Sequence, residues 1–188
     1  MDCIDAIMTR RSCRSFTDRK VEEDKILKIL ECAVYAPSPA NKQPWEFTVV
    51  LDREYGKRLK EESEKTKAYL ASRSGWKWLE SFDLEFVAQA PVLIVVTGDP
   101  AKNGAEQFLN VPGKCYVDAC SAAIQNICLA AHSLGLGSLW YTLYEKETAK
   151  EIFGVDKDPV GIVLIGYPAT PPGQTRRKSL DEKVRFIR

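Results

Sequence analysis

Three arginines and a serine stand close together near the start of the chain, at Arg10, Arg11, Ser12 and Arg14. The guanidinium group of arginine is always charged, and its donors match the geometry of phosphate oxygens. If this stretch is extended, alternate side chains point the same way. The outer two arginines and the serine could then grip one anion while Arg11 turns elsewhere. The competing interpretation is a solvated basic surface, because runs of charge are usually exposed.

A loop with three prolines forms the second candidate site. Residues 36–47 read Ala-Pro-Ser-Pro-Ala-Asn-Lys-Gln-Pro-Trp-Glu-Phe. Prolines restrict the backbone, and rigid loops that lead into strands often carry ligand contacts. Ser38, Asn41 and Gln43 are the polar side chains that could make such contacts. The alternative is a purely structural loop in which Trp45 anchors the core.

Two further stretches in the second half of the chain could approach a ligand. Residues 134–142 read Leu-Gly-Leu-Gly-Ser-Leu-Trp-Tyr-Thr, and glycines let the backbone come close to a bound group. The alternative for this stretch is a plain turn from helix to strand. A second basic cluster contains Arg176 and Arg177. The single histidine, His132, shares a helix face with Cys128, but two ligands do not make a zinc site, so we interpret it as a packed residue at a helix end.

Hydrophobic periodicity predicts helices mixed with strands. Residues 116–134 are apolar most of the way round, which indicates a buried helix, and their small side chains would let another helix approach closely in the core of a dimer. A polar loop is expected over residues 99–113, and residues 184–187 alternate like an edge strand. The other expected helices are residues 2–9, 21–36 and 147–153, and residues 54–85 are expected to be a charged helix followed by an aromatic cluster. The expected strands are residues 47–51, 90–97 and 160–168, the last of which closes in Gly-Tyr-Pro.

Composition excludes several functional classes. The 188 residues suit one domain. A balance of 27 Lys+Arg against 26 Asp+Glu provides no basic field, so no nucleic-acid partner is expected. The longest strongly apolar run, residues 90–96, is too short to cross a membrane. Six cysteines without a C-x-x-C pair, and no signal peptide at the start, predict reduced thiols in a cytoplasmic protein.

The candidate stretches together resemble the nitroreductase-like family of FMN-dependent oxidoreductases. The resemblance runs from about residue 4 to the last ten residues and leaves only residues 54–85 without a match. Ser179 replaces a proline that is usual in the family's tail motif. Five stretches carry the resemblance. Residues 10–16 resemble the family motif Arg-Arg-Ser-x-Arg-x-Phe, residues 36–45 resemble Ala-Pro-Ser-x-x-Asn-x-Gln-Pro-Trp, and residues 135–140 resemble Gly-Leu-Gly-Ser-x-Trp. Residues 166–168 resemble Gly-Tyr-Pro, and residues 177–182 resemble Arg-Lys-Pro-Leu-x-Glu.

The resemblance implies an FMN site shared between two subunits. The early arginines would hold the flavin phosphate and polar edge, and Arg177 would reach the same phosphate. The proline loop would lie against the flavin ring from the partner subunit, and the backbone after the glycines would support the ring. No catalytic side chain and no metal ligand are assigned. The implied cofactor-binding residues are Arg10, Arg11, Ser12, Cys13, Arg14, Ser38, Pro39, Asn41, Gln43, Trp140, Tyr141, Thr142 and Arg177.

The fold expected from the elements and the resemblance is α+β, with a central mixed sheet flanked by helices in a domain-sharing homodimer. Residues 1–188 would form a single FMN-binding domain. Within it, residues 54–85 would be a variable segment that covers the pocket, and residues 176–188 a tail whose strand-like end could pair with the other subunit. A flavodoxin-like, doubly wound sheet is not favoured, because no strand is followed by a glycine-rich phosphate loop.

The function implied is hydride transfer through FMN from NADH or NADPH to an electron-poor small molecule, such as a nitroaromatic, a quinone or an activated alkene. One alternative is a reductive dehalogenase or a flavin-consuming relative on the same fold. The family's deiodinases use a Glu-x-x-x-Tyr pair and a later lysine, whereas this chain has Lys65 four residues before Tyr69, and Ala90 near the position of the lysine. This departure argues against iodotyrosine as the substrate.

The cluster of Tyr69, Trp76, Trp78 and Phe82 could stack on a planar substrate, or it could be core or dimer surface. Two interpretations come from other functional classes: a nucleotide-binding protein without a redox role, and a nucleic-acid binder that uses the arginine clusters. The near-neutral net charge argues against the second.

Overall fold

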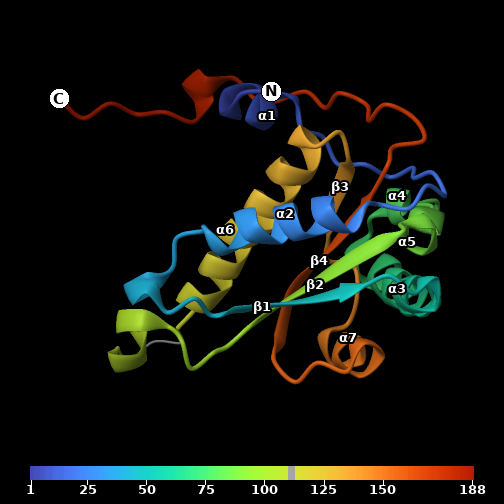
Figure 1. Cartoon of the computed structure of the whole chain (residues 1–188), viewed down its shortest axis with the longest axis horizontal. Coiled ribbons are helices and arrows are strands. Elements are labelled where there is room, and N and C mark those ends of the chain that lie inside the picture. The colour runs from blue at the N-terminus through green and yellow to red at the C-terminus, as the bar shows by residue number, and fades with distance from the viewer. Residues whose placement is uncertain (110–112) are drawn as a thin grey trace.

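A four-stranded sheet forms the centre of the protein, in a computed structural model that describes residues 1–109 and 113–188 (Figure 1). The strands are β1 (Trp45–Val50), β2 (Val92–Gly98), β3 (Gly137–Tyr141) and β4 (Asp158–Gly166), in the order β1-β2-β4-β3. All neighbouring pairs are antiparallel. The expected mixed sheet is therefore wrong for these strands, because β4 inserts between β2 and β3, which run in the same direction, and pairs antiparallel with both.

Helices cover both faces of this sheet, which confirms the α+β class. On one face lie α2 and α6, and on the other lie α3, α5 and α7 (Figure 1). The helices are α1 (Cys3–Thr9), α2 (Glu23–Val34), α3 (Arg53–Ser74), α4 (Lys77–Glu80), α5 (Glu85–Gln89), α6 (Cys115–Ser133) and α7 (Lys146–Phe153), with short 3-10 helices η1 (Pro39–Asn41), η2 (Gly104–Phe108) and η3 (Leu180–Glu182).

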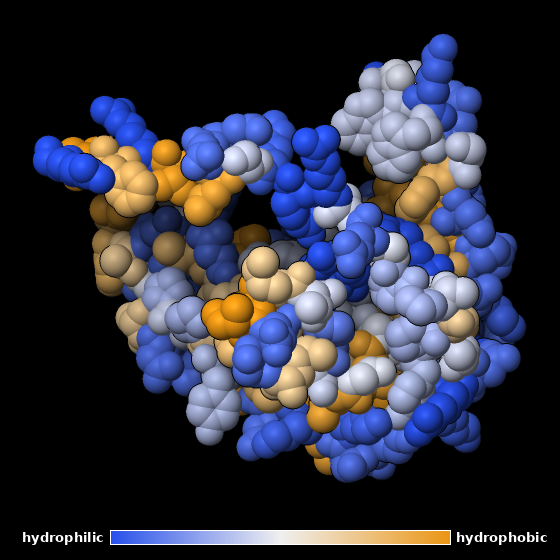
Figure 2. Space-filling view, turned by 90° about the horizontal axis from the view of Figure 1, so that it is seen from above, coloured by the Kyte–Doolittle hydropathy of each residue, from blue (hydrophilic) through white to orange (hydrophobic). Residues whose placement is uncertain are grey.

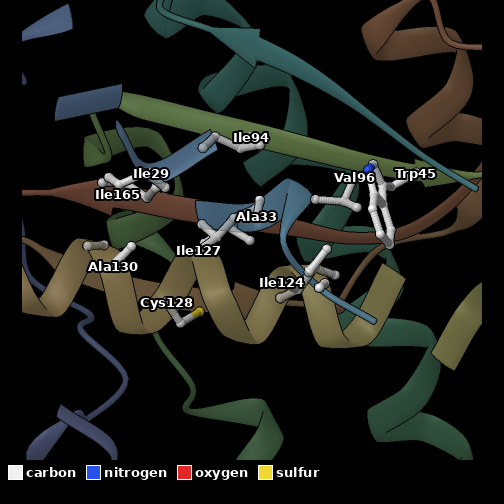
Figure 3. Close-up of a cluster of buried hydrophobic side chains, with 14 of the residues drawn as sticks. Ile29, Ala33, Trp45, Ile94, Val96, Ile124, Ile127, Cys128, Ala130 and Ile165 are labelled. Carbon is white, nitrogen blue, oxygen red and sulfur yellow. The ribbon is translucent and has the colours of Figure 1, made fainter. Parts of the chain in front are cut away.

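The two cores follow from alternation along the strands. Every residue of β2 is buried, as expected from its continuous apolar run. Ile94 and Val96 point into the core that also holds α2 and α6, and Figure 3 shows Val96 beside Trp45. Leu93 and Val95 point to the opposite face, into the core under α3, α5 and α7.

Local signals set several helix ends where the sequence places them. The Asp2 carboxylate accepts a hydrogen bond of 2.8 Å from the amide of Asp5 and caps α1. Helix α2 ends at Val34, before Pro37, which cannot continue a helix. Helix α7 ends at Gly154, whose φ of 65° lies in the left-handed region.

Helix α6 is buried within its own chain. Eight of its residues are buried, among them Ala123, Ile127 and Ala131, and they pack against the sheet and α2. Its small side chains let α2 cross closely, so the apolar character of α6 needs no second subunit to explain it. Among the described helices, none is both long and apolar enough to cross a membrane.

Residues 110–112 of the expected polar loop lie outside the described residues, and the described part of that loop contains η2. Residues 184–187 form no strand within this chain. The end of the chain instead extends away from the sheet (Figure 1), and Phe186 and Ile187 are 79% and 87% exposed.

Candidate functional site

The arginine stretch is positioned by β3, because the chain leaves α1 and runs beside that strand. The amide of Cys13 donates a 3.0 Å hydrogen bond to the carbonyl oxygen of Ser138, and Ser12 forms an isolated parallel bridge with Ser138. The Cys13 side chain is 1% exposed, and burial raises the pKa of its thiol. A Cβ at Gly137 would lie 2.6 Å from the sulfur atom of Cys13, so the close approach requires glycine. The Cys13 side chain thus belongs to the core.

A first cavity, of about 280 Å³, opens where α1 ends. Arg10 and Arg11 line it together with His132 and the start of β3. Nη1 of Arg11 donates to the carbonyl oxygens of Met8 and Arg10, both at 2.8 Å. The Nε atom of Arg11 is buried and has no partner among the described residues. This end of the site therefore presents two positive charges and a donor that an anion could satisfy.

A second cavity, of about 370 Å³, lies further along β3 and has aromatic walls. Arg14 lines this cavity, and its Cζ atom lies 5.9 Å from the centre of the Phe82 ring. Trp76 stacks on Trp78 at 6.0 Å between ring centres, and Trp78 meets Phe82 edge to face at 5.6 Å. Three members of the aromatic cluster thus line a cavity, whereas Tyr69 lines a separate one.

The arrangement of the arginines corrects one sequence expectation. Arg10 and Arg11 line the same cavity, and Arg14 lines the other. The expectation paired Arg10 with Arg14 and turned Arg11 away, because it assumed a regularly extended backbone. Instead, Arg10 ends α1 as its C-cap, and only Ser12 and Cys13 pair with β3.

Strand β3 joins the two cavities. Gly137 and Ser138 line the first, and Leu139, Trp140 and Tyr141 line the second, which continues to Thr142. The Tyr141 hydroxyl is buried, and burial raises its pKa. Seen from above Figure 1, the molecule is notched between two projecting parts, with hydrophilic side chains in the notch (Figure 2).

The proline loop lies apart from both cavities. Ser38, Pro39, Asn41 and Gln43 line neither of them. Oγ of Ser38 accepts a 3.0 Å hydrogen bond from the amide of Gln43, whose side chain donates to Oδ1 of Asn41 at 3.1 Å. Ala40, Asn41 and Gln43 have positive φ values of 48°, 52° and 45°. Three such residues in one short loop are a concentration of backbone strain that is typical of binding sites.

The tail passes the first cavity and then leaves the body of the chain. Pro172 lines that cavity. Residues 173–188 are exposed throughout, and Arg177 lines neither cavity. Trp45 is 7% exposed in the core, as the structural interpretation of the proline loop requires.

Comparison with known proteins identifies the family. The model of the nitroreductase family matches residues 7–167. The chain belongs to the nitroreductase family. A protein from Archaeoglobus fulgidus, named provisionally as an NADH dehydrogenase/NAD(P)H nitroreductase, is 36% identical over 173 residues, which cover 89% of this chain and 86% of that protein.

Two further similarities concern other members of this family. An iodotyrosine deiodinase from Haliscomenobacter hydrossis is 31% identical over 177 residues, covering 85% of this chain and 76% of that protein. The structure of a provisionally named nitroreductase from Desulfovibrio desulfuricans in complex with FMN aligns with a TM-score of 0.75 and 27% identity, covering 98% of this chain and 96% of that one.

The residues of this nitroreductase-family chain fit FMN. The unpartnered Nε of Arg11 and the nearby Arg10 suit the phosphate, and the aromatic walls of the second cavity suit a flavin ring. Arg14 could face the polar edge of that ring. No group of three or more potential metal ligands occurs in the described ranges 1–109 and 113–188.

Sequence reasoning missed His132 as a site residue. It lines the first cavity, and its Nε2 lies 2.8 Å from Oγ1 of Thr9. Burial, together with the positive charges of Arg10 and Arg11, lowers the pKa of its imidazole. One signal in the sequence could have indicated this position. His132 stands three residues before Gly135, and residues 135–137 line the same cavity.

Proposed function

We propose that this protein is an FMN-dependent oxidoreductase that passes a hydride from NADH or NADPH to an electron-poor small molecule, such as a nitroaromatic, a quinone or an activated alkene. The observation that carries the proposal is the course of β3, which begins in the cationic first cavity and ends in the aromatic second cavity. From Gly137 to Tyr141 the strand advances by roughly 13 Å. A flavin mononucleotide has its phosphate at one end and its ring system at the other, so it suits this division.

The side chains of the two cavities would divide the work of binding. When bound, FMN supplies the hydride chemistry, and the protein supplies orientation and electrostatics. Arg10 and Arg11 hold the phosphate. The positive charge of Arg14 stabilises negative charge at the ring end. The Tyr141 hydroxyl adds no negative charge beside the ring, and burial raises its pKa further above the ordinary value. We assign no protein acid or base.

The acceptor would bind against the aromatic wall of the second cavity. Trp76 and Trp78 are 55% and 57% exposed although they stack on each other, so each keeps surface available to a planar molecule. Apolar rings pack well on such faces and exclude water from the reacting centre. These residues come from the segment 54–85, which we propose covers the pocket.

A homodimer would complete the site. The strained proline loop and Arg177 both lie away from the cavities within one chain, so a second subunit is needed to bring them to a shared flavin. Exposed apolar side chains that could be covered in such a dimer occur on α1, on α2 and in the tail. They are Ile4, Ile7, Met8, Leu27, Tyr35, Leu180, Phe186 and Ile187.

Reductive dehalogenation is the second candidate, and the similarity to an iodotyrosine deiodinase favours it. The deiodinase pattern is not reproduced here, because Lys65 stands where that branch has its glutamate. Lys65 and Tyr69 line one cavity of about 740 Å³, whereas Ala90 is 1% exposed in the core. A halogenated phenol that is anionic could pair with Lys65.

The proposal is tested on the purified full chain. The expected result is a yellow protein whose released cofactor has the mass of FMN and whose reduced flavin is reoxidised by members of an acceptor panel. The panel should include nitroaromatics, quinones, enones and iodophenols, with halide release as the readout for dehalogenation. A protein that binds no flavin but binds other nucleotides would refute the proposal and support the non-redox alternative.

A further inference from the structure

His132 is the one histidine of the chain, and the FMN-binding roles proposed above do not use it. The ring is half-buried in the last turn of α6 and lines the first cavity beside Arg10 and Arg11. The negative end of the α6 dipole favours a protonated histidine there. The anion proposed for this cavity would also favour the protonated form of the His132 ring.

The hydrogen bonds of Thr9 assign the proton on the neutral ring. Oγ1 of Thr9 donates to the carbonyl oxygen of Asp5 at 2.5 Å, so its one hydrogen is already used. The same oxygen can therefore only accept from Nε2 of His132, at 2.8 Å. Nε2 carries the proton in the neutral ring, and Nδ1 is a bare acceptor until the ring is protonated.

The charged surroundings of the ring are positive. The positive charges of Arg10 and Arg11 act on it, and Met1 lines the same cavity. Cys128 lies one turn earlier on α6, and burial keeps its thiol neutral by raising its pKa. The lining segments from β3 and from the turn after β4 consist of glycine, leucine, serine and proline. These surroundings hold the pKa of His132 low until an anion offsets the two arginines.

We propose that His132 is a phosphate-binding residue of this cavity, and that its Nδ1–H, present only in the protonated ring, holds the cofactor phosphate more tightly in mildly acidic solution. The inference rests on the proposed function, because it takes the phosphate end of FMN as the anion. Thr9 is a positioning residue, since its hydroxyl fixes the ring through Nε2.

The sign of the pH dependence follows from linkage. A phosphate beside the ring favours the charged imidazolium, so FMN binding raises the pKa of His132. When binding raises the pKa of a protein group, the protein takes up a proton on binding. The affinity for that ligand therefore increases as the pH falls through the pKa of the group in the complex. A rise of about one unit corresponds to about a tenfold increase in the affinity for FMN relative to riboflavin.

The first experiment uses the single histidine as its own reporter. The imidazole of the wild-type chain, labelled with carbon-13, is titrated by NMR from about pH 5.5 to about pH 8.5, a range that brackets an ordinary histidine. The protein is measured with FMN and again with riboflavin, which has the ring but no phosphate. We expect a higher pKa of His132 with FMN, by about one unit or more. Equal values in the two complexes would overturn the inference.

The second experiment measures dissociation constants of FMN and riboflavin across the same pH range by quenching of flavin fluorescence. His132→Gln keeps a polar side chain that cannot become charged. The phosphate of FMN itself titrates near pH 6, and the pH dependence that remains in this variant reports that titration. As the pH falls, the ratio of the affinity for FMN to the affinity for riboflavin should increase about tenfold more in the wild type than in His132→Gln.

Thr9→Val should reduce the increase in the preference for FMN over riboflavin at low pH, and Thr9→Ser should retain that increase. Identical pH profiles for the wild type and His132→Gln would contradict the role of His132. Failure of both flavins to bind would refute the proposed function instead. If His132→Gln does not fold, the NMR comparison on the wild type still decides.

Discussion

Replacing Arg10 or Arg14 by alanine should separate the two ends of the proposed flavin site. Arg10 lies in the first cavity and Arg14 in the second, next to the Phe82 ring. A hydrogen bond to a charged group contributes about 1.5–3 kcal/mol. Arg10→Ala should therefore raise the dissociation constant of FMN by about 10- to 150-fold. The same change should leave riboflavin almost unaffected, because riboflavin has no phosphate.

Arg14→Ala should weaken FMN and riboflavin by the same factor, since its charge faces the ring end that both flavins share. Fluorescence titrations of each variant with both flavins measure these effects. Arg58→Ala is the matched control, because it removes the same charge from α3, where Arg58 lies over Tyr55 and outside both cavities. Loss of FMN but not riboflavin binding in Arg14→Ala would refute the assignment of the two ends.

Three further predictions concern the sheet, the dimer and acid stability. Gly161→Ala should destabilise the fold by about 1–3 kcal/mol in urea titrations, because the added Cβ would lie 2.2 Å from Nε1 of Trp140, and Trp140→Leu in the same chain should restore part of the loss. Deleting residues 180–188 should lower dimer formation and FMN occupancy together in sedimentation and absorbance measurements, and loss of only one would mean that the tail acts elsewhere. The hydrogen bond from Tyr167 lowers the pKa of Glu22 to about 2, so this contribution to stability is present above the ordinary glutamate pKa and is lost as the pH falls towards 2. Glu22→Gln should flatten the dependence of the urea midpoint on pH between about 5 and 2, and an unchanged profile would show that the bond does not persist in solution.

The double variant of Arg10→Ala and Arg177→Ala tests the shared site. If the tail of the second subunit brings Arg177 to the phosphate, the two losses of FMN affinity should not add, because residues that share a partner are coupled. Strict additivity would separate Arg177 from the phosphate held by Arg10.

One reason for expecting a dimer changes once the fold is known. The apolar helix at residues 116–134 suggested an interface, but α6 is covered by the sheet and α2 of its own chain. The stronger reasons are now the exposed apolar side chains Ile4 and Met8 on α1 and the extended tail with Phe186. A hydrophobic pattern identifies a buried helix, but it does not say whether its own chain or another one buries it.

The sequence by itself determined most of the helices and strands and the family of the chain. Helical spacing, the continuous apolar run of β2 and the capping residue Asp2 depend on neighbours in the chain, so local rules predict them well. The arginine stretch and the glycines of residues 135–137 likewise predicted a member of the nitroreductase family, and the family match confirms that prediction.

Only the tertiary structure decided which side chains meet. The first cavity is lined by residues 1, 9–11, 132, 135–138, 168 and 172, which come from distant parts of the sequence. The spacing of Arg10, Arg11 and Arg14 predicted the directions of their side chains only for an extended backbone. In the structure these directions are set by the end of α1 and by the pairing of this stretch with Ser138. His132 became part of the site for the same reason, because its role depends on where α6 ends relative to α1 and not on its neighbours in the chain.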